Sequence, residues 1–192
     1  MTFLKRIVPA LLVVAVASCA PFQLVENKPI TVDATFNVQP QMTWSSVTTN
    51  QKHVALWTVD GTSLNALYFF TGVSDGDTLI EIANAERKEL RPYRHTMLPD
   101  DVMEYIGFYL TRMGAQQLKT ANLRPAKIGT AQGFRFEASY VTRAGLKMKA
   151  MALFTQPGGK LCAMLFLAPD EYYYGHIAGQ VDTLFNTATL NG

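Results

Sequence analysis

The sequence has few of the residues that metal sites and disulfide frameworks need. Its 192 residues include two cysteines and three histidines. The histidines, His53, His95 and His176, are far apart, so no pair has the close spacing of a zinc site. The cysteines, Cys19 and Cys162, form no Cys-x-x-Cys pair either. We therefore expect no bound metal.

The chain also lacks an excess of either charge beyond its first residues. Lys and Arg number 17 against 15 Asp and Glu, and Lys5 and Arg6 account for the whole difference. The rest of the chain is formally neutral. Because a nucleic-acid-binding face needs clustered basic residues to neutralise phosphates, we expect no nucleic acid partner.

Motifs of catalysis are missing as well. No Gly-x-Ser-x-Gly elbow or Ser-x-x-Lys is present, and no serine stands in a recognisable nucleophile context. Asp75, Asp77 and Glu81 lack the spacing of a full calcium loop and are typical of a solvated turn. The glycines of 156–160 lie between two expected strands, which indicates a hairpin turn and not a phosphate-binding loop. We therefore expect a protein that is not an enzyme and holds no cofactor.

No apolar run reaches the length of about 20 residues that crosses a bilayer, but a shorter one occupies 7–17. Lys5 and Arg6 precede it and small residues follow it, which is the pattern of a secretory signal. Its ending, Val16-Ala17-Ser18-Cys19, resembles the lipobox of bacterial lipoproteins. The alternative is an ordinary cleaved signal with a coincidental cysteine.

The lipobox resemblance implies specific chemistry. Residues 1–18 are a signal peptide, and Cys19 becomes the new amino terminus, acylated on its thiol and its amine, with palmitate as an expected chain. Ala20 instead of Asp resembles the class sorted to the outer membrane, facing the periplasm. Cys162 is then the remaining thiol, and its place in the apolar run 161–168 indicates a buried, inert side chain.

The rest of the chain divides into a tether and one domain. Residues 19–35 contain Pro21 and Pro29, few large apolar residues and no helical period, so we expect a lipidated tether. Residues 36–192 are enough for a single domain with its own core.

Alternating apolar residues predict an antiparallel sheet of about six strands. Residues 53–58 and 65–70 flank the turn signal Asp60-Gly61 and form a hairpin. Residues 133–142, 146–154 and 161–168 are joined by short turns, which favours a C-terminal three-strand meander with one apolar face.

Two helices are expected to cover that face. The first spans about 100–113, with Asp101 as its N-cap, Glu104 completing a capping box, and Gly114 ending it. The second spans about 170–186, with Asp170 as its N-cap and an apolar stripe at helical spacing: Tyr174, Ile177, Val181, Leu184 and Phe185. An apolar sheet face covered by helices defines an α+β domain.

The order of these elements resembles the PsbP-like fold, which includes a photosystem extrinsic subunit and bacterial envelope lipoproteins of the DcrB type. The resemblance covers about residues 36–188. It depends on the hairpin 57–70, the Pro-Asp-Asp helix start at 99–101, Gly133-Phe-Arg-Phe-Glu137 and Ala168-Pro-Asp170. It implies a role in binding or assembly and carries no active site.

Two surface features are candidate interaction sites. Arg91 and Arg94 belong to a basic stretch with Arg87, Lys88 and His95, although a solvated face is the simpler interpretation.

Tyr172 and Tyr173 precede Tyr174, and three consecutive tyrosines cannot all point inward from one helix. Exposed tyrosines are enriched at protein interfaces. These features predict a non-catalytic, lipid-anchored envelope protein that binds another protein. The alternative is a carrier or sensor of a small apolar ligand or lipid.

Overall fold

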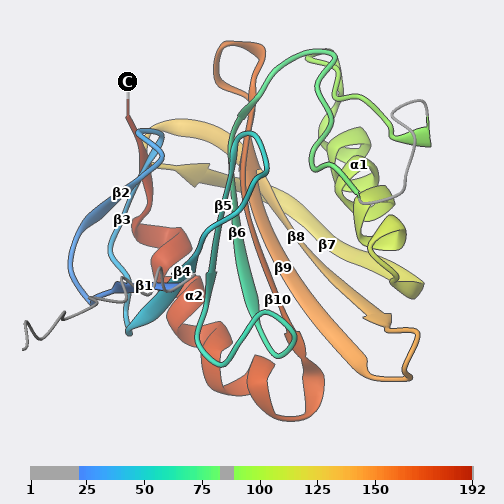
Figure 1. Ribbon diagram of the computed structural model, residues 1–192. Coiled ribbons are helices and arrows are strands. Elements are labelled where there is room, and N and C mark those ends of the chain that lie inside the picture. Colours follow the sequence, from blue (N-terminus) through green and yellow to red (C-terminus); the bar gives the residue numbers. More distant parts are fainter. Residues whose placement is uncertain (1–21, 83–88, 192) are drawn as a thin grey trace, which may run out of the picture.

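The computed structural model describes residues 22–82 and 89–191. Its main element is an eight-stranded sheet in which every neighbouring pair is antiparallel (Figure 1). In sheet order the strands are β1 (Phe22–Val25), β4 (Trp44–Val47), β5 (Val54–Thr58), β6 (Ala66–Val73), β10 (Leu161–Pro169), β9 (Lys147–Thr155), β8 (Ala131–Val141) and β7 (Gln116–Ile128).

A second, three-stranded sheet has the order β11 (Thr189–Leu190), β3 (Phe36–Val38) and β2 (Ile30–Val32). The predicted hairpin and C-terminal meander are both present. The expected number of about six strands in the main sheet was too low.

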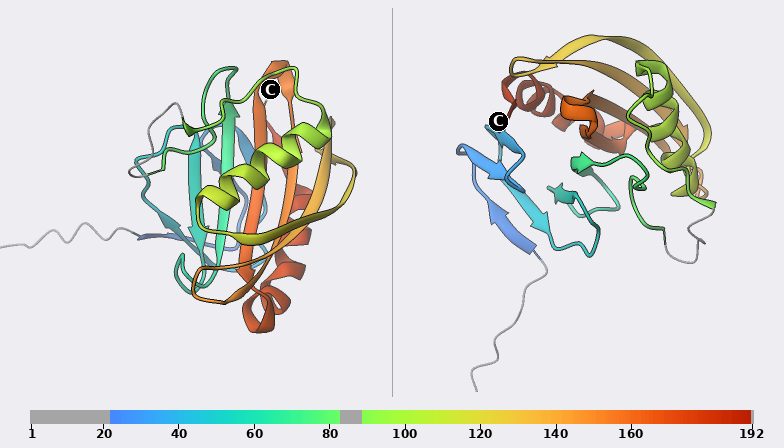
Figure 2. Two further views of the ribbon diagram at one scale, coloured as in Figure 1. Left: turned by 90° about the vertical axis from the view of Figure 1, so that its right-hand side faces the viewer. Right: turned by 90° about the horizontal axis from the view of Figure 1, so that it is seen from above.

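The helices lie on opposite faces of the curved main sheet (Figure 2). Helix α1 (Pro99–Arg112) covers one face. Helix α2 (Gly175–Thr187), preceded by an irregular turn at Asp170–Tyr174, covers the other. The prediction of one apolar face was therefore wrong, because the sheet is buried on both sides.

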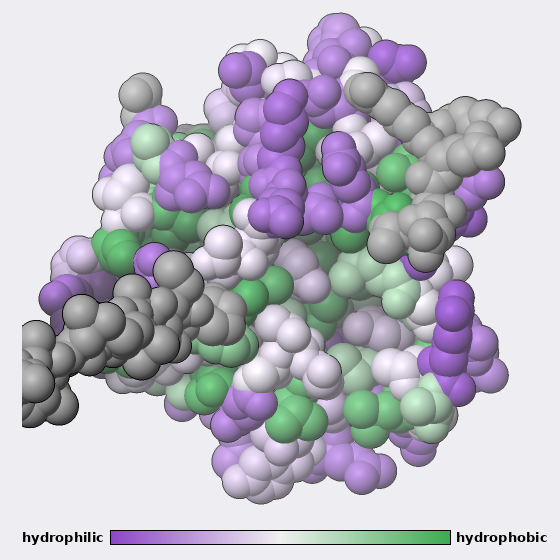
Figure 3. Space-filling view, in the orientation of Figure 1, coloured by the Kyte–Doolittle hydropathy of each residue, from purple (hydrophilic) through white to green (hydrophobic). Residues whose placement is uncertain are grey.

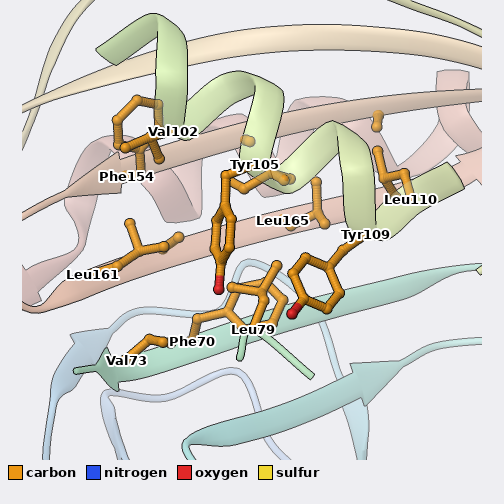
Figure 4. Packing of buried hydrophobic residues seen from close by; sticks show 14 of the residues in the cluster. Phe70, Val73, Leu79, Val102, Tyr105, Tyr109, Leu110, Phe154, Leu161 and Leu165 are labelled. Atoms are coloured by element: carbon orange, nitrogen blue, oxygen red, sulfur yellow. The ribbon is translucent and has the colours of Figure 1, made fainter. Parts of the chain in front are cut away.

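Strand β10 shows how the two faces arise. Ala163, Leu165 and Leu167 point toward α1, and the alternate residues Cys162 and Met164 point toward α2. On the α1 side, Tyr105 and Tyr109 of the helix pack in the same cluster as Leu165 (Figure 4). Two hydrophobic cores thus share one sheet.

The start of α1 differs from its prediction. Leu98 is the N-cap, and Asp101, three residues into the helix, accepts a hydrogen bond from the Leu98 backbone N–H at 2.9 Å. The reason is Pro99, whose fixed φ and missing N–H suit the first helical position. Gly114 ends the helix as expected, with φ +110°.

Helix α2 also begins later than predicted. Asp170 makes no cap; its carboxylate instead pairs with the Lys149 ammonium at 2.7 Å. The five-residue π-type turn then precedes Gly175, where the helix begins. The predicted stripe is buried from Ile177 to Phe185.

The segment 22–35, which we expected to be a tether, is folded. β1 pairs with β4 through Val25 and Trp44, and β2 pairs with β3. Val25 and Val32 are buried in the α2-side core. Of the predicted tether, only residues 19–21 lie outside the described part of the chain.

Gly133 lets β8 approach β9 closely, so a side chain at this position is expected to lower stability. A Cβ at this position would lie 2.2 Å from the backbone oxygen of Phe154. We expect Gly133→Ala to lower the free energy of unfolding by about 3 kcal/mol, because the strands must separate. Denaturant unfolding followed by circular dichroism measures the change.

The matched control is Gly179→Ala in α2, where a Cβ would meet no atom within 4 Å. It should leave stability unchanged or raise it by up to about 1 kcal/mol through helix propensity. Equal effects of the two substitutions would contradict the packing argument.

Candidate functional site

The candidate ligand site is a hollow of about 620 Å³ on the α1 side of the sheet. It lies where α1 ends, between the β5–β6 turn and the β8–β9 turn. The space-filling view shows green and pale surface over the lower right part of the molecule, bordered by purple side chains (Figure 3). Its lining residues are Thr62, Asn65, Ala66, Tyr68, Ile82, Leu110, Arg112, Met113, Gly114, Ala115, Tyr140, Thr142, Arg143, Ala144, Met148 and Leu167.

The hollow has a mixed lining, in which apolar side chains and two phenols lie beside polar residues such as Asn65 and Thr142. Leu110, Met148 and Leu167 are buried, and Tyr68 and Tyr140 are partly buried. Burial raises the pKa of Tyr68, and burial, followed by the nearby Tyr68, raises the pKa of Tyr140 to about 12. Both phenols are therefore neutral at physiological pH.

Within residues 22–82 and 89–191, no hydrogen bond reaches the hydroxyl of Tyr68 or Tyr140. The Tyr68 ring is fixed by stacking on Phe70, with centroids 6.0 Å apart and planes 4° from parallel. The hollow thus presents two neutral hydroxyl groups beside apolar side chains.

Two arginines border the hollow. The Arg112 guanidinium pairs with Glu89 at 2.8 Å, and Arg143 is exposed with its Nε beside Gly114. Apolar side chains with a few polar groups and the positive charge of Arg143 are suited to a small amphipathic anion.

The tyrosine surface predicted from the sequence lies on the other side of the sheet. Tyr172 is 59% exposed, and its ring stacks on His176 with centroids 4.0 Å apart. Tyr173 is partly exposed and meets Tyr172 edge to face. Tyr174 instead turns inward and stacks on Phe166 of the α2-side core.

Arg91, Arg94 and His95 of the basic stretch each contact a residue elsewhere in the domain. The Arg91 guanidinium lies 5.1 Å above the ring centre of Phe108, in α1. Arg94 pairs with Asp75 at 3.5 Å, and the backbone N–H of His95 donates to the same carboxylate at 2.9 Å.

The backbone N–H of His95, and next its side chain, hydrogen-bond to the Asp75 carboxylate and lower the pKa of Asp75. Arg87 and Lys88, the other basic residues of this stretch, lie outside the described residues. The structure therefore does not bring Arg91 and Arg94 together with Tyr172 and Tyr173, which lie on the opposite face of the sheet.

The remaining chemistry candidates are dispersed. Cys162 is 4% exposed, and burial raises its pKa to about 11. Over residues 22–82 and 89–191, no three His, Cys, Asp or Glu side chains gather as a possible metal site. In the same part of the chain, no helix has the length and apolarity needed to span a bilayer. Cys19 lies outside the described residues.

Sequence reasoning missed the hollow. Its lining comes from residues between 62 and 167, on four strands, two turns, the segment at Ile82 and the end of α1. No local pattern in the sequence marks such a set, because only the sheet register brings Tyr68 and Tyr140 to the same surface.

The comparisons with known proteins support the fold. No family model matches the sequence, and no curated protein matches it significantly. Among solved structures, the chain is similar to cyanobacterial PsbP (CyanoP) from Synechocystis, with 11% identity and a TM-score of 0.57, over 93% of this chain and 97% of that one. The chain therefore has a PsbP-like fold, as the order of elements predicted.

A second solved structure overlaps less well. It is LpqN, described as involved in cell envelope biogenesis of Mycobacterium tuberculosis, with 11% identity and a TM-score of 0.40. The similarity covers 91% of this chain and 88% of LpqN.

The environment of Cys162 predicts its reactivity. At pH 8, a thiol with a pKa about three units higher is ionised in roughly one molecule in a thousand. In a Cys19→Ser protein, where Cys162 is the only thiol, we expect almost no reaction with a disulfide reagent such as DTNB until the protein is unfolded.

In guanidinium chloride the same protein should react fully within minutes and release one equivalent of thionitrobenzoate from DTNB. Equally fast reaction of the folded and unfolded forms would contradict the burial of this thiol.

Proposed function

We propose that this protein is a lipid-anchored, non-catalytic accessory factor of the bacterial cell envelope that binds another envelope protein. The anchor would be Cys19, acylated after removal of residues 1–18, and Ala20 favours the outer membrane. Support for this location comes from the lipobox resemblance. Support for a binding role comes from the exposed aromatic surface at the start of α2.

The observation that carries the binding role is the fixed outward position of Tyr172. The Lys149–Asp170 ion pair and the stacking of Tyr174 on Phe166 hold the irregular turn from its two ends. Tyr172 therefore stays exposed on a turn that is already ordered. A partner would lose little conformational entropy on binding such an aromatic side chain.

Site-specific crosslinking in cells tests this proposal. With p-benzoylphenylalanine in place of Tyr172, we expect a discrete protein adduct after irradiation, because aromatic contacts at this surface would bring the probe within reach of the partner. The matched control places the probe at Thr183, an exposed position further along α2, where no such adduct is expected.

The same cells, grown with an alkyne fatty acid, report acylation of the wild-type chain and its loss in Cys19→Ser. Absence of an adduct at position 172, or adducts of equal yield at 172 and 183, would contradict the partner surface. Labelling that survives in Cys19→Ser would contradict the anchor.

The hollow supports a second candidate function, the binding of a small amphipathic ligand. Its volume is in the range of small-molecule sites, and its apolar side chains, neutral phenols and Arg143 would suit a small apolar group with an anionic head.

Anilinonaphthalene sulfonate, an apolar ring system with one negative charge, is a suitable probe for this site. We expect wild-type protein to raise its fluorescence and Ala144→Trp to weaken binding at least about tenfold, because the indole fills the hollow. Fluorescence titration gives both dissociation constants.

Thr183→Trp adds the same indole on the far side of the sheet and should leave probe binding unchanged. Identical affinities for all three proteins would rule out the hollow as the binding site.

A further inference from the structure

The edge of the main sheet formed by β1 exposes large apolar side chains. β1 pairs with β4 on one side and has no strand on its other side among the described residues. Phe22 is 48% exposed and Leu24 is 70% exposed. An apolar strand edge with unpaired backbone groups invites association, and natural proteins usually cover or charge it.

The opposite edge of the same sheet is protected in that usual way. β7 carries two register irregularities, after Gln116 and after Ala121. Its exposed residues include Lys119, Arg124 and Lys127. Charge and bulges discourage edge-to-edge pairing. The apolar exposure of β1 is therefore specific to this edge of the fold.

The apolar surface of β1 continues onto the face of the sheet. Phe22 is the cross-strand partner of Val47, and Val47 is the partner of Leu56. Directly paired residues point to the same side of a sheet, so Phe22, Val47 and Leu56 form one row. Leu24, two residues after Phe22 on β1, points to the same side. Val47 is partly exposed, and we call the exposed set of Phe22, Leu24 and Val47 the N-terminal strip.

The N-terminal strip lies close to the predicted anchor along the chain. Two residues, Ala20 and Pro21, lie between Cys19 and Phe22, so the Cα atoms of Cys19 and Phe22 are at most about 11 Å apart even when the chain is fully extended. The headgroup layer on each side of a bilayer is about 5–8 Å thick. An acylated Cys19 would thus hold β1 within or just above the headgroups.

We propose that the N-terminal strip rests on the membrane, with Phe22 and Leu24 inserted among the lipid headgroups. This inference depends on the proposed acylation of Cys19. Membrane contact covers the apolar edge, and the added apolar burial reinforces the acyl chains. The short connection favours lipid over a protein as the occupant, because it keeps the strip beside the bilayer at all times.

The test uses the full lipidated protein in phosphatidylethanolamine and phosphatidylglycerol vesicles. A Leu24→Cys protein carries an NBD fluorophore on the new thiol, since the buried Cys162 should not label. The matched control is Ala121→Cys on β7, the strand at the far edge of the sheet. Figure 2 shows β1 and β7 on opposite sides of the molecule.

We expect nitroxide-labelled lipids to quench the probe at position 24 by about twofold or more, as for a side chain at the headgroup boundary. The probe at 121 should be unaffected. Mass spectrometry of the same preparations establishes whether Cys19 is acylated.

Each other outcome has a distinct meaning. An acylated protein whose two probes respond equally would overturn membrane docking but leave the anchor intact. A probe at 24 that is shielded from aqueous iodide but not quenched by the nitroxide lipids would show that a second copy of the chain covers the strip, which also overturns docking. A chain without acyl groups on Cys19 would overturn the anchor and the docking together.

Discussion

The fold depends on one strand being buried on both faces. All nine residues of β10 are buried, between β6 on one side and β9 on the other. An antiparallel strand of this kind cannot leave a face to water, so each face requires a cover. Helix α1 and helix α2 supply those covers, and the two cores are the direct result.

The positions of the hollow and of the Tyr172 surface follow from how α1 and α2 pack against β10. Helix α1 has 14 residues and is about 21 Å long, whereas the nine residues of β10 extend for about 30 Å. The helix is therefore too short to cover the strand, and the hollow occupies the end beyond Gly114. At the same end, β10 runs directly into the irregular turn, where Asp170 and Tyr174 are fixed and Tyr172 is left outside.

The parts of the fold with strong periodicity could be predicted from the sequence. The alternation of Phe134, Phe136 and Ala138 defined β8, and the helical spacing around Ile106 defined α1. The short N-terminal strands could not be predicted, because three or four residues show no measurable period and Pro29 favours an irregular segment. β7 was missed for another reason. It is an exposed edge strand with bulges, so its side chains do not alternate between apolar and polar.

The candidate sites also differ in how far they could be predicted from the sequence. The sequence predicted that the three consecutive tyrosines cannot all point inward, and the structure has Tyr172 exposed and Tyr174 stacked on Phe166. Their exact orientations were not predictable, because they lie in an irregular turn and not in the helix. The hollow depends on the register between distant strands. The basic stretch was a candidate on charge alone, with a solvated face as the simpler interpretation. Its sequence could not show that Arg91 contacts Phe108 and that Arg94 pairs with Asp75.

The folded N-terminal segment changes what an anchored domain of this kind could reach. A flexible tether over 19–35 would let the domain move tens of ångströms from the membrane. Since β1 begins at Phe22, an anchor at Cys19 leaves no such freedom. A domain of about 170 residues has a radius of gyration of about 15 Å, so its far side lies roughly 40 Å from the bilayer. Any partner that meets Tyr172 must then come within that distance of the membrane, which favours a protein that is itself part of the membrane or held at its surface.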